Sequence, residues 1–542
     1  MRIAQWNANG LQQHKEEVKL FLNQNLIDIL LLSETHFTSK NHFTIPGYDL
    51  CCTNHPDGTA HGGTAILLKN TIAYYEQLQY AKPEIQATSV RVKGPLREIT
   101  ITAVYCPPRH NLKAEHFEAF FQTLGPCFLA GGDFNSKHTL WGSRLSTTKG
   151  RELAKVIQAQ NFSYLSTGTP TYWPTDPNKL PDLLDFFITN GISTTYADVQ
   201  ANYDLTSDHT PVIATITTSV VVRKPAPRLH TSQTNWDLYK TEVRKHTTTP
   251  MKLKTSEDIE VATTNFIAIL QQAAKAATPP RRPSNPTSHL PSEIKRLVAI
   301  KRKARSKWQK THAPDDRRLF NNASNKLKAA LHKLRNTSFN AYISTLQRDD
   351  NTIWKPLKSR KRPQTPLLPI RKNSTPPGPW AKSDSEKVEL FATHLAEVFT
   401  PHDDTPDPDV ERQLATQIQH PETLQAFTLK ELKQVIKSLN PLKAPGSDLI
   451  TAQMIQETPP EGLQTLLHIY NAIIRVEYWP VPLKHAKVIM IPKPGKDPTD
   501  VTSYRPISLL PIISKILEKL LLKRIYNDTY FKEWIPQHQF GF

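Results

Sequence analysis

Residues 128–136 read FLAGGDFNS, and this stretch decides how the first part of the chain folds. Its apolar start, Phe128–Ala130, leads into two glycines, which is typical of a buried strand that ends in a sharp turn. Asp133 and Asn135 follow, and an extended backbone places both on the same side at the rim of a sheet. A carboxylate beside an amide can orient a water molecule and hold a phosphate oxygen. The alternative is an ordinary turn, in which Gly, Asp and Asn are common.

Three other predicted strands end in the same way, with a polar or phenolic side chain at or just after an apolar run. These strands span Arg2–Asn7, Ile27–Leu32 and Ile99–Tyr105. Together with the first stretch, the strand-end residues are Asn7, Glu34, Tyr105 and Asp133. One such residue is ordinary, but four are difficult to explain by solvation alone. If the strand ends gather at one edge, the four side chains converge on one site.

Two later motifs add charged groups. The run LLDFFIT, residues 183–189, places Asp185 in an otherwise apolar strand, where a lone carboxylate needs a partner. Asp208 and His209 precede another predicted strand, Pro211–Ile216, and a His paired with an Asp keeps its tautomer and its positive charge. The alternatives are a satisfied core Asp and a capping Asp-His turn.

Composition limits the class of protein. The 542 residues are enough for two to four domains, and 44 prolines indicate long connecting stretches. The four cysteines form no C-x-x-C pair, which argues against a zinc knuckle or a disulfide framework and suits a reducing compartment. The N-terminus lacks the apolar core of a signal peptide, and no run approaches the roughly 18 apolar residues of a membrane span. We therefore expect a soluble, intracellular protein.

The positive charge is concentrated in the middle of the chain. Residues 281–362 hold 22 Lys and Arg against 5 Asp and Glu, an excess of +17 in a total of +19. Residues 1–216 hold 17 against 19, a balance of −2. A basic block of this kind predicts a polyanionic partner, most simply nucleic acid, whose binding is sensitive to salt. The alternative is a solvated basic linker.

The segment 219–380 is predicted to be a basic, proline-containing helical linker region. Helical spacing covers Trp236–Ala277, and helices rich in Lys and Arg are predicted over Glu293–Lys310 and Arg317–Leu346. The run SRKR at 359–362 is either a nuclear import signal or a charged tail.

Six motifs in the first 218 residues, taken in order, resemble a known fold. They are WNANG, LLLSETH, AVYCPP, GGDFN, LLDFFIT and TSDHTPV. The set resembles the endonuclease/exonuclease/phosphatase fold and, within it, the apurinic-type endonuclease of non-LTR retrotransposons, especially the jockey group. The resemblance implies an α/β architecture: a two-sheet αβ-sandwich with its site at one edge. It also implies a divalent metal, usually Mg²⁺, with Mn²⁺ as a substitute.

The resemblance also implies roles at the metal and at the attacking water. Glu34 matches the metal carboxylate of the family, and Asp208 matches a second metal contact. Mg²⁺ prefers one or two carboxylates, with water and substrate phosphate completing its shell. Asp133 matches the residue that positions or deprotonates the attacking water, although which carboxylate is the true base stays open.

The remaining implied roles concern the phosphate. Asn135 and Asn7 match neighbours that orient the phosphate and the metal environment, and Tyr105 matches a phenol on the phosphate side. His209 would stabilise the developing charge, with Asp185 as its orienting partner. The implied reaction is phosphodiester hydrolysis that leaves a nick with a 3′-hydroxyl.

Aromatic residues lie in two further segments that resemble the retrotransposon type, residues 135–143 and 171–174. Trp141, Tyr172 and Trp173 could contact bases or sugars of bound DNA. The alternative is packing beneath the loops.

The last third, 381–542, resembles the N-terminal, fingers-like α+β portion of a retrotransposon reverse transcriptase. The motifs are LNPLKAPGSD, IMIPKPGKD, SYRPISLL and HQFGF. By this resemblance Lys487, Lys493 and Arg505 would be cations on the template or nucleotide side, the alternative being ordinary surface charge. The polymerase aspartates of the family follow the Phe-Gly-Phe segment, and this sequence ends at Phe542. We therefore expect this incomplete portion to be inactive as a polymerase.

Taken together, the resemblance predicts a metal-dependent DNA endonuclease of a jockey-like non-LTR retrotransposon, whose nick primes reverse transcription. The expected partners are target DNA and, through the basic 281–362 block, the RNA of the element. Nuclear residence follows only from the need to reach chromosomal DNA; otherwise the protein is cytoplasmic. Two alternatives stay open: a nucleic-acid-binding remnant of a decayed element, and another phosphodiesterase of the same fold.

Overall fold

The structure is a computed structural model, and its described residues form two compact units. They are residues 1–94, 97–176, 178–195, 197–217, 220–222, 227–247, 252–280, 291–346, 354, 356, 368–372, 380–400, 409, 412 and 425–527. The first unit comprises Met1–Pro225, Ser284–Pro369 and Trp380–Ser383. The second comprises Ala226–Pro283, Ile370–Pro379 and Asp384–Phe542. The SRKR run and the final HQFGF motif lie outside the described residues.

The first unit contains two mixed sheets. The first sheet is formed by β1 (Arg2–Asn7), β2 (Ile29–Ser33), β3 (Tyr48–Thr53), β4 (Thr64–Lys69), β12 (Asp198–Ala201) and β13 (Val212–Thr215). Their order is β12-β13-β1-β2-β4-β3. The second sheet is formed by β5 (Tyr74–Glu76), β6 (Tyr80–Ala81), β7 (Gln86–Lys93), β8 (Glu98–Tyr105), β9 (Phe128–Asp133), β10 (Ser163–Leu165) and β11 (Asp185–Asn190). Their order is β10-β11-β9-β8-β7-β5, with β6 paired to β7.

Each sheet contains one parallel pair, and these pairs bring the strand ends together. β1 runs parallel to β2, with Asn7 opposite Ser33, and β8 runs parallel to β9, with Tyr105 opposite Asp133. Because parallel strands end at the same edge, their terminal side chains are neighbours. β11 runs antiparallel to β9, so its first residue, Asp185, lies opposite Asp133.

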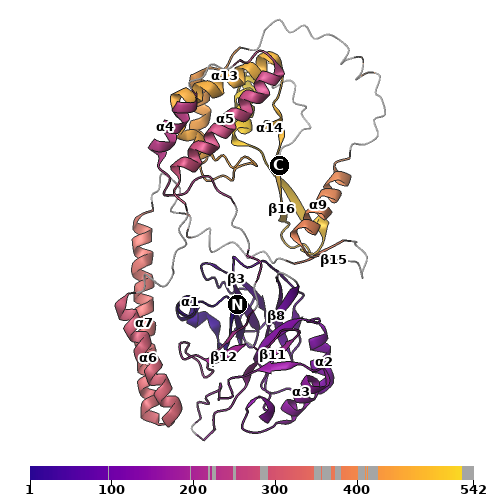
Figure 1. The fold of residues 1–542 in the computed structure, drawn as a ribbon, viewed down its shortest axis with the longest axis vertical. Helices are drawn as coiled ribbons and strands as arrows, with labels where there is room; N and C mark the ends of the chain where they lie inside the picture. The colour runs from indigo at the N-terminus through magenta and orange to yellow at the C-terminus, as the bar shows by residue number, and fades with distance from the viewer. Residues whose placement is uncertain are drawn as a thin grey trace. The chain divides into compact units, whose positions relative to one another are not determined.

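Apolar side chains hold the two sheets face to face. Ile3 and Leu31 of the first sheet and Ile101 and Leu129 of the second are fully buried in one shared core. Helix α1 (Lys15–Gln24) packs on the outer face of the first sheet. Helices α2 (Ala114–Gln122) and α3 (Thr148–Ala159) cover the second and lie together beside β8 and β11 in Figure 1. This arrangement confirms the predicted two-sheet αβ-sandwich.

Strand β9 approaches its neighbours too closely for side chains at its two glycines. A Cβ atom at Gly132 would stand 1.9 Å from the carbonyl oxygen of Val104, and one at Gly131 would stand 2.4 Å from the ring of Phe187. The two glycines that mark the end of the apolar run therefore allow β9 to reach the edge where Asp133 sits.

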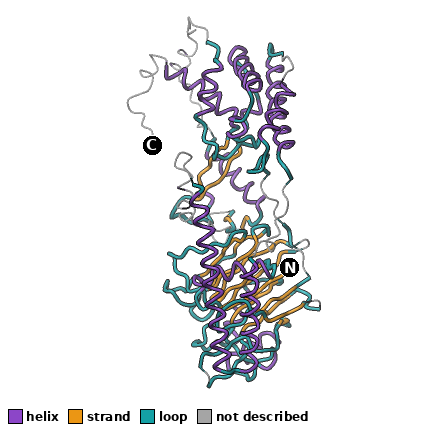
Figure 2. Tube along the Cα trace, turned by 90° about the vertical axis from the view of Figure 1, so that its left-hand side faces the viewer, coloured by secondary structure: helices purple, strands orange, loops and turns teal. Residues whose placement is uncertain are grey.

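Two basic helices of the middle segment also belong to the first unit. They are α6 (Ser292–Thr311) and α7 (Pro314–Ser344), called here the helix pair. They lie side by side (Figure 1), joined by a short turn in which His312 adopts a left-handed conformation and Pro314 starts α7. The unit also contains the 3₁₀ turns η1 (Leu11–His14) and η2 (Thr139–Trp141), and β15 (Trp380–Ala381). Figure 2 distinguishes strands, helices and loops by colour.

The second unit is mainly helical. Its elements are α4 (Trp236–Thr247), α5 (Ser256–Ala277), α9 (Asp384–Val398), α11 (Leu429–Lys437), α12 (Ala452–Gln456), α13 (Pro460–Val476), α14 (Val481–Lys484), α15 (Ile512–Asn527), β14 (Ile370–Arg371), β16 (Lys487–Pro492), β17 (Tyr504–Leu509) and η4 (Val501–Ser503). Phe266, Leu432, Tyr470 and Ile516, from four of these helices, are buried in a common core. No helix in the described part of the chain is long and apolar enough to cross a membrane.

The grouping of helices differs from the order of the three predicted segments. Within the predicted linker region, α4 and α5 bury their apolar faces in the core of the second unit. The helix pair joins the first unit instead. Hydrophobic spacing in the sequence identifies these helices, but it does not say which neighbour each apolar face will meet.

Candidate active site at the sheet edge

Four of the predicted site residues form one hydrogen-bonded network at the edge of the two sheets. The Asn7 amide donates to Glu34 Oε1 and to Asp133 Oδ2, each at 2.9 Å. Asn135 donates to Asp133 through its amide at 2.9 Å and through its backbone N–H at 2.9 Å. One amide therefore joins a carboxylate that follows β2 to a carboxylate that ends β9.

A His–Asp pair completes the site from the other side. His209 Nδ1 lies 2.7 Å from Asp185 Oδ2, and His209 Nε2 lies 3.9 Å from Asp133 Oδ2. Thr171 Oγ1 donates to the same Asp185 oxygen at 2.7 Å. Asp185 therefore fixes the orientation of the ring and leaves Nε2 facing Asp133.

Burial and mutual charge shift the pKa values of the central pair. Burial, supported by the nearby Asp185 and Glu34 carboxylates, raises the pKa of Asp133 to about 7 against the opposing effect of His209. Burial alone would lower the pKa of His209, but the carboxylates Asp185, Asp133 and Asp208 raise it to about 10. At neutral pH the imidazole is therefore a cation, and the Asp133 carboxyl exchanges a proton readily.

Glu34 is deprotonated and Tyr105 is protonated, because their pKa values are shifted in opposite directions. Burial would raise the pKa of Glu34, but hydrogen bonds from His36 and Asn7 and the charge on His209 lower it. Burial and the adjacent Glu34 and Asp133 raise the pKa of Tyr105 far above its ordinary value. Glu34 is thus an anion at neutral pH, whereas Tyr105 stays a phenol that can donate a hydrogen bond.

The backbone at this edge is unusual. Asn9, Glu34, His36 and Asn135 all have positive φ angles, between 44° and 54°. Side chains other than glycine rarely adopt this left-handed conformation, which costs free energy unless the surroundings impose it. Its concentration around one cluster of polar side chains is typical of a functional site.

The donor set fits a divalent cation. Asp133, Asp185 and His209 offer polar side-chain atoms that all lie within 4.8 Å of one another, and of these only the carboxylates can bind a metal while the His209 imidazole is protonated. Asp185 Oδ1 and Asp208 Oδ1 are buried without a hydrogen-bond partner, which is costly for a carboxylate oxygen. Carboxylate oxygens are the ligands that Mg²⁺ and Mn²⁺ prefer.

The three aromatic residues predicted near DNA differ in their burial. Trp141 is 1% exposed, stacks on Phe186 at 4.7 Å and donates to the Ser136 carbonyl. This burial corrects the predicted DNA contact of Trp141 in favour of the packing alternative. Tyr172 is half-buried, with its ring 4.9 Å from that of His209, so it borders the site. Trp173 is buried and donates to Thr210 Oγ1 at 3.0 Å.

The three cations predicted on the polymerase-like portion lie on or beside one strand pair in the second unit. β16 and β17 are antiparallel, with Lys487 opposite Leu509 and Arg505 opposite Ile491. Lys487 and Arg505 are exposed, and Lys493 Nζ donates to the Thr502 carbonyl at 2.8 Å.

Sequence reasoning missed two residues that support the site. Ser207 Oγ accepts a hydrogen bond from Trp6 Nε1 at 2.9 Å and lies 2.8 Å from the Asn7 carbonyl, so it ties the His209 loop to the end of β1. Thr171 holds Asp185. Ser207 precedes the Asp-His dipeptide and could have been noticed there, whereas Thr171 begins the 171–174 segment, which stands out only for its aromatic residues.

Comparison with known proteins agrees with this geometry. Residues 4–209 match the Endonuclease/Exonuclease/phosphatase family. The chain is 34% identical over 551 residues to the RNA-directed DNA polymerase from mobile element jockey of Drosophila melanogaster, an alignment that covers 100% of this chain and 60% of the relative. It is 32% identical over 557 residues to the probable RNA-directed DNA polymerase from transposon X-element of the same species, again covering 100% and 60%.

Among solved structures, the endonuclease domain of TRAS1, a telomere-specific non-LTR retrotransposon, is 21% identical, with a TM-score of 0.34. That match covers 40% of this chain and 98% of the solved one. The chain spans about 60% of the length of the two polymerase relatives. Residues 4–209 are thus similar to the Endonuclease/Exonuclease/phosphatase family, within a chain that is similar over its whole length to RNA-directed DNA polymerases of mobile element jockey and transposon X-element.

Proposed function

We propose that the first unit is a metal-dependent DNA endonuclease that nicks target DNA and leaves a 3′-hydroxyl for target-primed reverse transcription. One observation supports the proposal most directly. The hydrogen-bonded Asn7–Glu34–Asp133 network and the His209–Asp185 pair lie together at one sheet edge. Similarity to polymerases of mobile elements favours DNA as the substrate.

In this proposal Asp133 accepts a proton from the attacking water. A pKa of about 7 suits a general base that works near neutral pH. Asn135, bonded to the same carboxylate, orients the water and a phosphate oxygen. The water oxygen forms a bond to phosphorus, the bond from phosphorus to the 3′ oxygen breaks, and that oxygen takes up a proton to become the 3′-hydroxyl.

The surrounding side chains stabilise the charge that develops on the phosphate. The His209 cation, oriented by Asp185, donates from Nε2 toward a phosphate oxygen. The Tyr105 phenol donates to the phosphate from the end of β8, beside Asp133. Glu34 and Asp208 would hold Mg²⁺, or Mn²⁺ in its place, which when bound supplies positive charge to the phosphate.

The other parts of the chain are proposed to hold nucleic acid. The basic 281–362 block would bind the RNA of the element, and Lys487, Lys493 and Arg505 would contact template or nucleotide. We propose no polymerase reaction for residues 381–542. The work of the nuclease on chromosomal DNA would take place in the nucleus.

Nicking of supercoiled plasmid by the full chain tests the proposal. We expect nicking with Mg²⁺, none with EDTA, and none by Asp133→Ala or His209→Ala. Sealing of the product by a ligase would establish a 3′-hydroxyl beside a 5′-phosphate.

Two other outcomes would redirect the function. A folded parent chain that binds DNA but never nicks it would favour the nucleic-acid-binding remnant. Cleavage of phospholipid or inositol phosphate in place of plasmid would favour another phosphodiesterase of the same fold.

A further inference from the structure

Arg305 of α6 is completely buried beneath the loop that carries Asp208 and His209. Its guanidinium donates to the Leu205 carbonyl and, at 3.0 Å, to the His209 carbonyl. Burial of a charged group is costly unless the surrounding groups compensate for it. Here the compensation comes from backbone carbonyls of one segment, Tyr203–Thr210, called here the 203–210 loop, and from the nearby carboxylates of Glu17 and Asp204.

Neighbouring residues of α6 hold the same loop. Lys301 donates to the Asp204 carbonyl, and Arg302 pairs with the Asp204 carboxylate. Gln309 donates to Thr210 Oγ1 at 3.1 Å. Four residues on one face of α6 therefore contact the loop at its start, middle and end.

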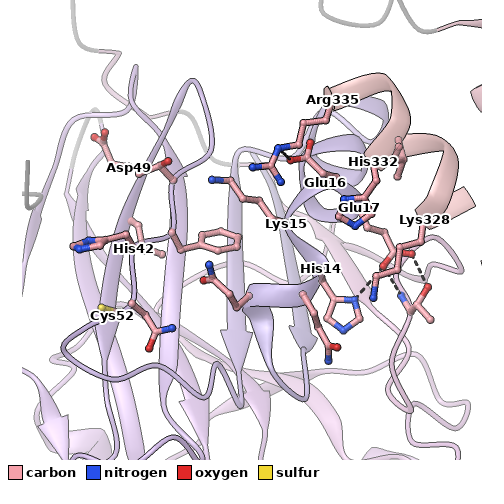
Figure 3. A pocket seen from close by; sticks show the side chains of 18 of the residues that line it. His14, Lys15, Glu16, Glu17, His42, Asp49, Cys52, Lys328, His332 and Arg335 are labelled. Atoms are coloured by element: carbon pink, nitrogen blue, oxygen red, sulfur yellow. Dashed lines mark hydrogen bonds and ion pairs between the residues drawn. The ribbon is translucent and has the colours of Figure 1, made fainter. Parts of the chain in front are cut away.

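The opposite side of the loop is held by the sandwich itself. Ser207 is fastened to the end of β1, and Thr206 Oγ1 donates to Glu17 of α1 at 2.5 Å. Glu17 also accepts from Lys301, so the same carboxylate bonds α1, the loop and α6. Figure 3 shows Glu17 beside His14, at the border of a cavity of about 1580 Å³ that α7 also lines.

Aromatic contacts and a further ion pair also connect the helix pair to the sandwich. The rings of Trp173 and Trp308 lie 5.9 Å apart, and Trp308 stacks on Phe320 of α7 at 5.6 Å. The Arg305 guanidinium lies 5.5 Å from the Phe320 ring. Further along α7, Arg335 pairs with Glu16 at 3.4 Å (Figure 3).

We propose that Arg305 is a positioning residue of the nuclease: it fixes the 203–210 loop from outside the sandwich, so that His209 and Asp208 keep their places at the sheet edge. This assignment rests on the proposed endonuclease function. It makes the basic helix pair a functional part of the nuclease. It also distinguishes the two buried cations of α6, Lys301 and Arg305, from the exposed cations of that helix, which are suited to binding nucleic acid.

The test uses the full chain with Arg305→Ala, Arg305→Lys and the control Glu293→Gln, which removes an exposed negative charge from the same helix and so takes no cation away from nucleic-acid binding. For Arg305→Ala we expect kcat for nicking to fall roughly 100-fold, because small displacements of catalytic groups are this costly, while KM for DNA stays near that of the parent. Arg305→Lys should keep an intermediate kcat. Glu293→Gln should keep the kcat of the parent.

Chemical rescue separates positioning from a loss of fold. Millimolar guanidinium ion can enter the space left by Arg305→Ala and should restore part of kcat, without effect on Glu293→Gln. Near-parental kcat in Arg305→Ala would overturn the assignment. So would a loss that Arg305→Lys shares in full and guanidinium does not relieve. A parent chain that never nicks DNA would remove the proposed function and this assignment with it.

Discussion

Asp133, Asp185 and His209 lie buried in one cluster at the sheet edge of the first unit, whereas Lys487 and Arg505 in the second unit are exposed to solvent. In the first cluster, fixed partners and low polarity move the pKa values of Asp133 and His209 far from their ordinary range. Water screens the exposed cations, which are free to adapt to any anion nearby. The comparison shows that the buried cluster has fixed side chains suited to catalysis, whereas the exposed cations can adjust to the position of a bound anion.

The largest effect is expected when the proposed general base of the buried cluster, Asp133, is replaced. Asp133→Asn should lower the nicking rate about 1000-fold, since a positioned general base contributes on this scale. The pKa of Asp133 is raised in the folded state, so above the ordinary pKa of an Asp its charge disfavours folding. Asp133→Asn should therefore unfold at the parental temperature or higher near pH 7, as differential scanning calorimetry will show.

Asp28→Asn is the control for this substitution, because Asp28 pairs with Lys69 at the surface of the same unit. It should leave nicking unchanged. Parental nicking by Asp133→Asn would contradict the role of Asp133 as base.

A second prediction concerns the carboxylate that joins the sandwich to α6. Burial would raise the pKa of Glu17, but Lys301 and hydrogen bonds from His14 and Thr206 lower it to about 2. Because the folded pKa lies below the unfolded one, this stabilisation is complete above about pH 4.5 and is lost as the pH falls toward 2. The full difference is on the order of 3 kcal/mol.

Urea unfolding of the parent and of Glu17→Gln between pH 6 and pH 3 would measure this contribution. The parent should lose its advantage over Glu17→Gln as the pH falls. A constant difference across this range would show that the Glu17 charge does not stabilise the contact.

The third prediction tests the support beneath the His–Asp pair. Thr171→Val removes the hydroxyl that donates to Asp185, leaving a buried carboxylate oxygen with one partner fewer. We expect a loss of about 1–3 kcal/mol in the free energy of unfolding. Thermal unfolding beside the exposed control Thr169→Val checks this, and equal stability of the two variants would contradict it.

The smallest effects are expected in the exposed region. Lys487→Ala with Arg505→Ala should leave plasmid nicking unchanged and reduce the salt dependence of RNA binding, by about 0.7 in the log–log slope for each phosphate that is no longer neutralised. Fluorescence anisotropy at several salt concentrations measures the slope, with exposed Lys519→Ala as control. A fall in nicking would contradict the separation of the two regions.

The sequence by itself determined the strands that carry the candidate site and most of the residues proposed for it. The runs that end at Asn7, Tyr105 and Asp133 were predicted almost to the residue, because apolar runs bounded by turn residues are local signals. The aspartate of the LLDFFIT run also proved to be buried at the same edge. These polar side chains stand out because they interrupt apolar stretches.

Only the tertiary structure decided which residues support the polar side chains of the candidate site. Thr171 holds Asp185, and Arg305 holds the loop of His209 across 96 residues of chain. In the sequence Arg305 is one cation among many in a basic helix, and its full burial depends on which surface α6 meets. That choice is made by packing between distant segments, since hydrophobic periodicity shows that a helix has an apolar face without showing what will cover it.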